Sequence, residues 1–280
     1  MTKKQHYLPQ FYLKNFVGDK GKIWTYDRSK EKIYACNPRD IACENYLYET
    51  RWENANSELG EFVLPNHIEK QFAEQEGKYS KLLKRIVEIC TNAENEKALI
   101  CNREEKEILA SFVSNMFLRN PWSMEKADLE CVTDGVMDLK EIKAMDTILQ
   151  YLGYGGTESL VKFSSKRIWL DNDFEGGMQQ VLQEELRGTN FCILKANNKQ
   201  FITSSFPVSF GNGTYFPLSP QFALLYYDEI PYQVKNRMAL MPEDEMDFCN
   251  NQYIKLSIEQ VRFIFAKEKK VLEQLAEKEC

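Results

Sequence analysis

The sequence predicts an α+β fold, and two kinds of hydrophobic periodicity carry this prediction. Apolar residues recur at helical spacing through the middle of the chain, whereas strand-like runs occur near its start and again after Gly188. Segregation of the two patterns is typical of α+β folds, and alternation would be expected of a parallel α/β sheet. We therefore expect an N-terminal helix and β-hairpin, central long helices, and a small, mainly antiparallel C-terminal sheet with terminal helices.

The length and composition indicate an ordinary globular chain. Its 280 residues are 43% hydrophobic and 28% charged, which is sufficient for a sizeable core. We expect a single domain over residues 1–280. Within it we distinguish an N-terminal helix and hairpin region (1–60), a helical region (61–188) and a sheet-containing region (189–280).

The first eighteen residues predict an extended segment that leads into a short helix. Pro9 suits a first helical turn and pushes the residue before it towards extended geometry, so residues 5–8 should be extended. Four apolar residues then share one helical face: Phe11, Tyr12, Leu13 and Phe16. Gly18 is suited to end this helix in left-handed geometry.

The next elements are a hairpin and two long helices. Residues 22–27 and 32–36 are rich in β-branched and aromatic residues and are separated by a short polar turn, which predicts a hairpin. Residues 66–91 predict a long amphipathic helix. A second helix should run over residues 102–120, with Asn102 and Glu105 as a capping box and Pro121 as its stop.

The second half of the chain predicts more helix and then strands. Residues 122–188 indicate helices with irregular connections, including a glycine-rich break at 153–156 and a helix over about 173–186 that ends near Gly188. Strand-like runs follow at 190–195, 200–204, 222–227 and 261–266. Two proline-bearing corners, 203–208 and 215–220, lie between these strands.

The charge distribution leaves a local phosphate-binding role open. The net charge is −6, but residues 1–40 hold nine Lys or Arg and four Asp or Glu, which is +5 there and −11 beyond. The overall charge argues against a surface made for nucleic acid. The basic region suits one phosphate-bearing partner, a nucleotide or nucleic acid, and it equally suits a solvated surface.

Cysteine and histidine spacing predicts no zinc site. The eight cysteines are scattered without paired CxxC spacing, and there are only two histidines. We expect reduced, mostly buried thiols, and the sequence leaves a carboxylate-bound magnesium open. No apolar run is long enough to span a membrane, and the start lacks a signal-peptide core, so we expect a cytoplasmic protein whose oligomeric state stays open.

Four residues at element ends are candidates for catalysis. His6 suits proton transfer near neutral pH, and Gln10 lies at the start of the helix that follows; the alternative is that this segment simply packs into the core. Arg119, before Pro121, suits either a helix dipole or an anion. Ser204 can line a pocket or satisfy turn backbone. We expect these four residues to meet around one cleft, and the competing account makes them a buried structural network.

Five further residues are candidates for ligand contacts. Two are carboxylates near predicted helix ends, where each suits the helix dipole as well as a site. Glu44 precedes a helix-prone segment and Glu69 lies in the first turns of the long helix. The remaining three, Tyr7, Tyr48 and Ser219, fall in short motifs beside the catalytic candidates.

These motifs follow one another along the chain: His6-Tyr-Leu-Pro-Gln-Phe-Tyr-Leu13, Asn45-Tyr-Leu-Tyr48, Glu69 and Glu76, Arg119-Asn-Pro121, Phe201-Ile-Thr-Ser204 and Phe216-Pro-Leu-Ser219. With them the chain resembles the domain of unknown function family 4238 over most of its length. The resemblance implies candidate positions and no established activity. The family's later motif reads Thr-Ser-Asp-Asn-Pro, whereas this chain has Ser205 and Phe206 at its third and fourth positions, so a carboxylate role there is lost.

Several known chemistries are disfavoured by missing motifs. The chain has no P-loop, dinucleotide glycine pattern, GxSxG elbow or zinc deaminase signature, and no histidine follows Arg119. Our leading hypothesis is a nuclease-like hydrolase that acts as an effector in bacterial or phage conflict, such as phage defence or a toxin. In it His6 is the acid or base and Arg119 holds a phosphate. The alternative hypothesis is a binding module that recognises a nucleotide or small ligand without turning it over.

Overall fold

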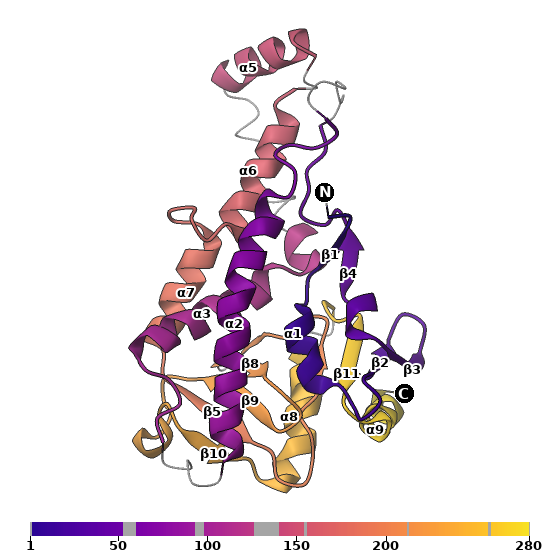
Figure 1. Cartoon of the computed structure of the whole chain (residues 1–280), viewed down its shortest axis with the longest axis vertical. Coiled ribbons are helices and arrows are strands. Elements are labelled where there is room, and N and C mark those ends of the chain that lie inside the picture. Colours follow the sequence, from indigo (N-terminus) through magenta and orange to yellow (C-terminus); the bar gives the residue numbers. More distant parts are fainter. Residues whose placement is uncertain are drawn as a thin grey trace. The chain divides into compact units, whose positions relative to one another are not determined.

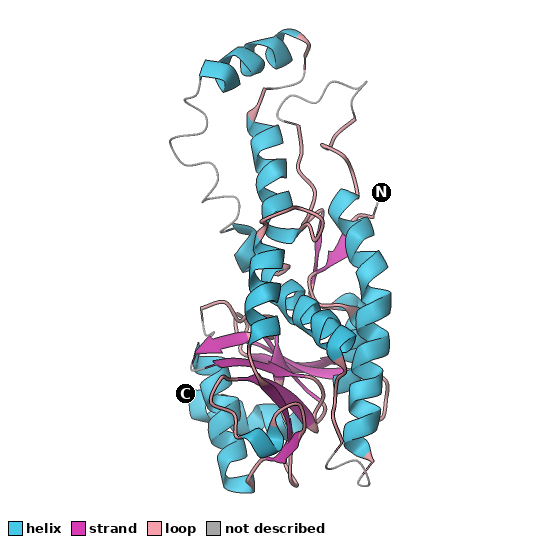
Figure 2. Ribbon diagram, turned by 90° about the vertical axis from the view of Figure 1, so that its left-hand side faces the viewer, coloured by secondary structure: helices cyan, strands magenta, loops and turns pink. Residues whose placement is uncertain are grey.

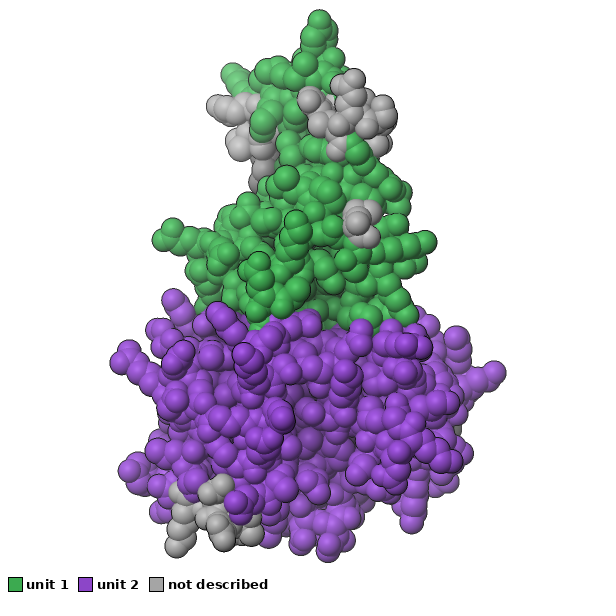
Figure 3. Space-filling model, in the orientation of Figure 1, with its two compact units in different colours: residues 1–7, 43–75, 118–181 green, residues 8–42, 76–117, 182–280 purple. Residues whose placement is uncertain are grey.

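The extended start and short helix are present as predicted. The computed structural model describes residues 2–52, 60–92, 98–125, 140–153, 156–211, 213–256 and 259–279. Helices and mainly antiparallel sheets make up this part of the chain, so the predicted α+β fold is confirmed (Figures 1 and 2). The chain divides into unit 1 (residues 1–7, 43–75 and 118–181) and unit 2 (8–42, 76–117 and 182–280), coloured in Figure 3. The single domain over 1–280 stays a prediction.

A four-stranded antiparallel sheet in unit 2 joins the two ends of the chain. Its order is β3 (Lys32–Cys36), β2 (Ile23–Asp27), β11 (Phe263–Ala266) and β6 (Thr203–Ser204). The predicted hairpin is thus confirmed, and β11 pairs directly with its first strand. Helix α9 (Lys269–Glu279) packs against β2, β3 and β11.

A second sheet in unit 2 has five strands where the sequence predicted one small sheet. Its order is β10 (Met238–Leu240), β5 (Phe191–Lys195), β9 (Phe222–Tyr226), β8 (Gly213–Pro217) and β7 (Ser209–Gly211), antiparallel except for β10 and β5. The expectation of a corner over 215–220 was wrong at its start, which is strand β8. Gly213 permits this pairing, because a Cβ there would lie 2.5 Å from the Tyr226 carbonyl oxygen.

The opening helix packs its aromatic face into the core of unit 2. Helix α1 (Gln10–Leu13) continues as a 3₁₀ turn, Lys14–Phe16. The Tyr12 ring stacks on Phe216 with centroids 5.2 Å apart, and Phe112 packs edge-on against Phe216 at 5.4 Å. Gly18 does not end the helix in left-handed geometry, because Val17 already leaves it extended. A Cβ on Gly18 would approach the Lys267 carbonyl oxygen at 3.0 Å, so close packing favours glycine there.

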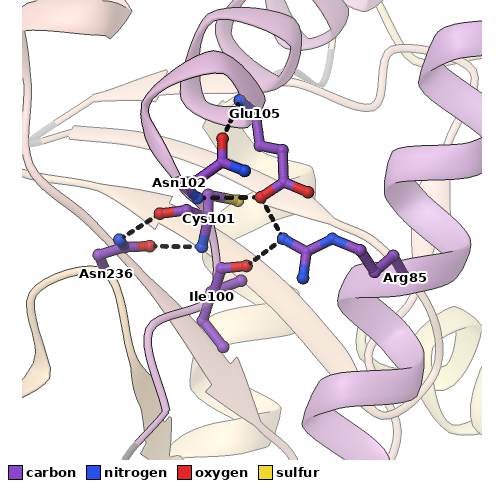
Figure 4. A network of polar contacts seen from close by, with 6 residues as sticks. All are labelled: Arg85, Ile100, Cys101, Asn102, Glu105 and Asn236. Atoms are coloured by element: carbon purple, nitrogen blue, oxygen red, sulfur yellow. Dashed lines mark hydrogen bonds and ion pairs between the residues drawn. The ribbon is translucent and has the colours of Figure 1, made fainter.

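The start of α3 (Arg103–Leu118) is held by the predicted capping box, which is confirmed (Figure 4). The Glu105 N–H donates to Asn102 Oδ1, and the Asn102 N–H donates to the Glu105 carboxylate, both at 2.9 Å. Arg85 pairs with the same carboxylate and donates to the Ile100 carbonyl at 2.8 Å. The helix ends at Leu118 and not at residue 120, so Arg119 follows it.

Unit 1 contains a two-stranded sheet and helical segments. Strands β1 (Lys4–His6) and β4 (Cys43–Asn45) pair antiparallel. Glu44 is therefore a strand residue that pairs in register with Gln5, and its assignment to a helix end was wrong. Helices with residues in this unit include α2 (His67–Thr91), α5 (Lys140–Tyr151), α6 (Glu158–Leu170) and α7 (Met178–Gly188), and residues 121–125 are helical as well.

Two of these helices differ from the sequence expectation at their ends. The long helix α2 is confirmed within one residue of the predicted start. Helix α7 begins at Met178, five residues later than predicted, because the Asp171 carboxylate accepts the Asp173 N–H and holds a turn there. The turn also passes close to α6. A Cβ on Gly177 would lie 2.7 Å from the Ile168 carbonyl oxygen, so only glycine permits this approach. The sequence also predicted helices and a glycine-rich break within residues 122–188. Residues 126–139 and the middle of the 153–156 break lie outside the described residues.

Candidate functional site

The main chain of His6 is clamped by two side chains in unit 1. His6 ends strand β1, and its carbonyl oxygen accepts a 2.6 Å hydrogen bond from Nη2 of Arg119. The Tyr48 hydroxyl lies 3.2 Å from the same oxygen and 2.9 Å from the Arg119 carbonyl, to both of which it can donate. The backbone of the half-buried His6 is therefore anchored at its carbonyl group.

Arg119 is itself buried, with 1% of its surface exposed. Its Nε donates to the Tyr48 hydroxyl at 3.4 Å, and its guanidinium carbon lies 4.3 Å from the centroid of the Phe72 ring. Burying a cation is costly unless carbonyl oxygens and π faces replace water. The Arg119 site supplies both, so the guanidinium is fixed in one orientation.

A second set of buried polar side chains holds the segment that carries Tyr48. Gln5 accepts the Tyr48 N–H at 2.9 Å and donates to the Glu49 carboxylate at 2.7 Å. Glu49 also accepts the Asn66 N–H, and Lys166 donates to the Glu49 carbonyl at 2.9 Å. Gln5 is fully buried, and Glu49 and Lys166 are nearly so. Together these bonds make the Tyr48 position rigid.

Unit 1 therefore brings three of the predicted site residues into contact: His6, Tyr48 and Arg119. Of the others in this unit, Tyr7 is buried, Glu44 is exposed on β4 and Glu69 lies in the first turn of α2.

The remaining three predicted residues belong to unit 2. Gln10 is the first residue of α1. The Ser204 hydroxyl donates to the Phe206 carbonyl at 2.7 Å and lies 3.1 Å from the Tyr253 hydroxyl. The Ser219 hydroxyl accepts the N–H groups of Gln221 and Phe222 at 3.2 and 3.1 Å. Both hydroxyls thus satisfy turn backbone, as the alternative for these serines anticipates.

Sequence reasoning missed a polar cluster centred on Asp171 in unit 1. Asp171 is fully buried and follows α6. Its Oδ2 accepts from Arg167 Nε at 2.8 Å and lies 3.4 Å from His67 Nε2. Its Oδ1 accepts from Gln71 Nε2 at 2.7 Å and from the Asp173 N–H at 2.9 Å. The only local signal was the i,i+4 spacing of Arg167 and Asp171.

The hydrogen bonds at Asp171 decide its charge. Burial raises the pKa of the carboxyl, but the bonds from Arg167, the Asp173 N–H, Gln71 and His67 outweigh it and hold the pKa below its ordinary value. Asp171 is therefore an anion at neutral pH. A carboxylate that accepts a ring N–H of histidine leaves the other ring nitrogen as an acceptor, the arrangement that catalytic histidines use.

Unit 2 has hollows lined by polar side chains. One of about 560 Å³ and one of about 490 Å³ share four lining residues: Asn198, Lys199, Gln200 and Glu268. Ser219 lines the second of them. Their volumes lie in the range of small-ligand sites.

Thiols and metal ligands add no further site in the described part of the chain. Burial raises the pKa of the Cys90 and Cys101 thiols to about 12, so they are poor nucleophiles. Among the described residues, no three His, Cys, Asp or Glu side chains are grouped so that they could hold a metal ion. Within the same residues, no helix is both long and apolar enough to cross a bilayer.

Comparisons with known proteins identify the family. Searches of curated proteins and of solved structures found no significant match. The model of one family does match, over residues 4–270, which is nearly the whole chain. The chain therefore belongs to the family described as protein of unknown function DUF4238.

Proposed function

We propose that this chain is a nuclease-like hydrolase that acts as an effector in bacterial or phage conflict, with His6 as the acid or base. The observation that carries the proposal is the clamp on the His6 carbonyl by Arg119 and Tyr48. A catalytic side chain must be held within a fraction of an ångström of its working position. The clamp acts on the main chain, so it holds in place the backbone that carries the imidazole.

Arg119 supports the same proposal through its charge. Its guanidinium is buried and lies against the His6 backbone, so its positive charge is weakly screened. A phosphate held near His6 is stabilised by this charge, and so is the additional negative charge that develops during phosphoryl transfer.

The direct test is product analysis after the purified protein is incubated with RNA, DNA and common nucleotides. His6→Ala should lower the rate at least about 100-fold, the usual range for loss of a general acid or base. Lys3→Ala, which removes an exposed charge from the same segment, is the matched control and should retain activity. The melting temperature of His6→Ala should change little, because the clamped carbonyl remains. Retained activity in His6→Ala would contradict the proposal.

A growth assay extends this test to the biological role. Expression of the wild-type chain should be toxic, and His6→Ala should abolish the toxicity. If both proteins are equally toxic, the role assigned to His6 is wrong.

A non-catalytic nucleotide or small-ligand binding module is the second candidate. It is favoured by the adjoining hollows of unit 2, which offer both amide and lysine side chains. Recovery of an intact ligand from the purified protein, together with no product from any substrate, would favour this candidate over the hydrolase. Gln200→Leu should then weaken binding, whereas His6→Ala should not.

A further inference from the structure

Two nitrogen-bearing side chains share one buried carboxylate oxygen at the Asp171 cluster. Arg167 and His67 both lie against Oδ2 of Asp171, at 2.8 and 3.4 Å. Their nitrogens are thus within about two hydrogen-bond lengths of each other. The carboxylate is completely buried, whereas the side chains of His67 and Arg167 are 33% and 35% exposed. The anion therefore lies on the inside and the two nitrogen-bearing side chains reach the surface of unit 1.

Both side chains keep hydrogen-bonding capacity on their outer side. Arg167 contacts Asp171 through Nε, and its guanidinium lies over the Phe174 ring at 5.7 Å. Within the part of the chain that the structure describes, no residue accepts a hydrogen bond from its Nη groups or bonds to Nδ1 of His67. A guanidinium that donates to one carboxylate through Nε can still donate from its two Nη groups to a second oxyanion.

The side-chain oxygen of Gln71 needs a hydrogen-bond donor. Its Nε2 donates to Asp171, so the amide orientation is fixed, because the reverse would set Oε1 against a carboxylate. Oε1 is buried and has no hydrogen-bond partner. A buried acceptor without a donor is costly, and it indicates a missing O–H or N–H group.

From these three side chains we propose that His67, Arg167 and Gln71 bind the phosphate group of a small phosphomonoester. A phosphate monoester offers several acceptor oxygens to the Nη groups of Arg167, and also to Nδ1 of His67 when the imidazole carries both ring protons. Its second pKa is about 6, so a fraction near neutral pH also carries a P–O–H that can donate to Gln71. Carboxylates and sulfates lack this combination of charge and donor at neutral pH. The site does not depend on the role of His6, because it is defined by binding alone.

The two histidines make the test direct, since a carbon-edited proton spectrum of the imidazoles holds only His6 and His67 signals. His6→Asn assigns the His67 signal. Inorganic phosphate and adenosine monophosphate should each shift it saturably, and adenosine should not. Arg167→Gln should weaken binding at least about tenfold, the loss of roughly one good ionic hydrogen bond. Arg167→Lys should recover part of it, because lysine keeps the charge and loses the fork.

The matched control is Arg51→Gln, which removes an arginine of the same unit that pairs with Glu61 at 2.6 Å. Phosphate should bind this variant as it binds the wild type. Absence of a saturable shift at tens of millimolar phosphate would overturn the proposal. An equal shift in Arg167→Gln, or a shift with adenosine alone, would also overturn it.

Discussion

Two arginine–carboxylate clusters of this chain are built differently. At the start of α3, Glu105 and Asn102 bond to each other's backbone N–H groups, and Arg85 bridges Glu105 to the Ile100 carbonyl (Figure 4). In unit 1, Asp171 is buried completely and collects donors from several segments. The first carboxylate completes the backbone bonds of a helix, and the second holds side chains that face outward.

The comparison indicates that the role of an ionic cluster can be inferred from the groups that its side chains contact. A capping carboxylate satisfies orphan N–H groups, so its contribution is to stability. Asp171 is completely buried, whereas Glu105 is 18% exposed. Arg85 and Arg167 are exposed to a similar extent, 38% and 35%, but an Nη group of Arg85 donates to the Ile100 carbonyl, whereas Arg167 contacts Asp171 through Nε. We infer that the α3 cluster serves folding and that the Asp171 cluster serves both folding and binding.

The largest expected effect is that of Asp171→Ala. It removes the acceptor of three side chains and one N–H group. We expect a loss of about 2–4 kcal/mol in the free energy of unfolding. Urea unfolding of the variant beside the wild type measures it. A loss below about 1 kcal/mol would mean that the cluster is not held as described.

Acid should weaken the same cluster. The pKa of folded Asp171 is held below its ordinary value, so the carboxylate contributes stability that is complete above the unfolded pKa of about 3.9. That contribution is lost as the pH falls through the folded pKa. Asp171→Asn should therefore destabilise the protein at pH 7 and less so in acid. Urea unfolding at several pH values tests this, and a constant difference between the two proteins would contradict it.

A smaller effect is expected at the α3 cluster. Asn102→Ala removes the cap acceptor for the Glu105 N–H and should cost about 1 kcal/mol. Because Arg85 and Glu105 remain paired, the helix should still form. Phosphate binding should be unchanged in this variant, whereas it should be weakened in Arg167→Gln. A parallel loss of phosphate binding in Asn102→Ala would remove the distinction between the clusters.

The sequence predicted those elements whose signals are local. The capping box needs only Asn102 and Glu105, three residues apart, and the hairpin needs two adjacent β-rich runs. Strands β7 and β8 were not predicted, because the prolines near them favour corners over strands. The glycines at 211 and 213 do indicate a tight connection between two strands. Pairing of β11 with the hairpin is a contact across the whole chain, which no local pattern encodes.

The candidate site residues show the same division between features with a local sequence signal and contacts that are distant in the sequence. Motifs indicated His6, Tyr48 and Arg119, which meet in unit 1, but not that Arg119 would bond to the His6 carbonyl. No motif in the sequence pointed to a role for His67. Its partner Asp171 lies 104 residues further on, so nothing in the sequence near either residue links them.

The most direct test of the account is a comparison of thermal unfolding with and without phosphate. A ligand that binds only the folded state stabilises it by about 1.4 kcal/mol when its free concentration is ten times its dissociation constant. Wild type and Asn102→Ala should both gain this stability, although the variant starts lower. Arg167→Gln, which binds at least about tenfold more weakly, should gain at most about 0.4 kcal/mol. If all three proteins respond equally, or if only Asn102→Ala loses the response, the division into a folding cluster and a binding cluster is wrong.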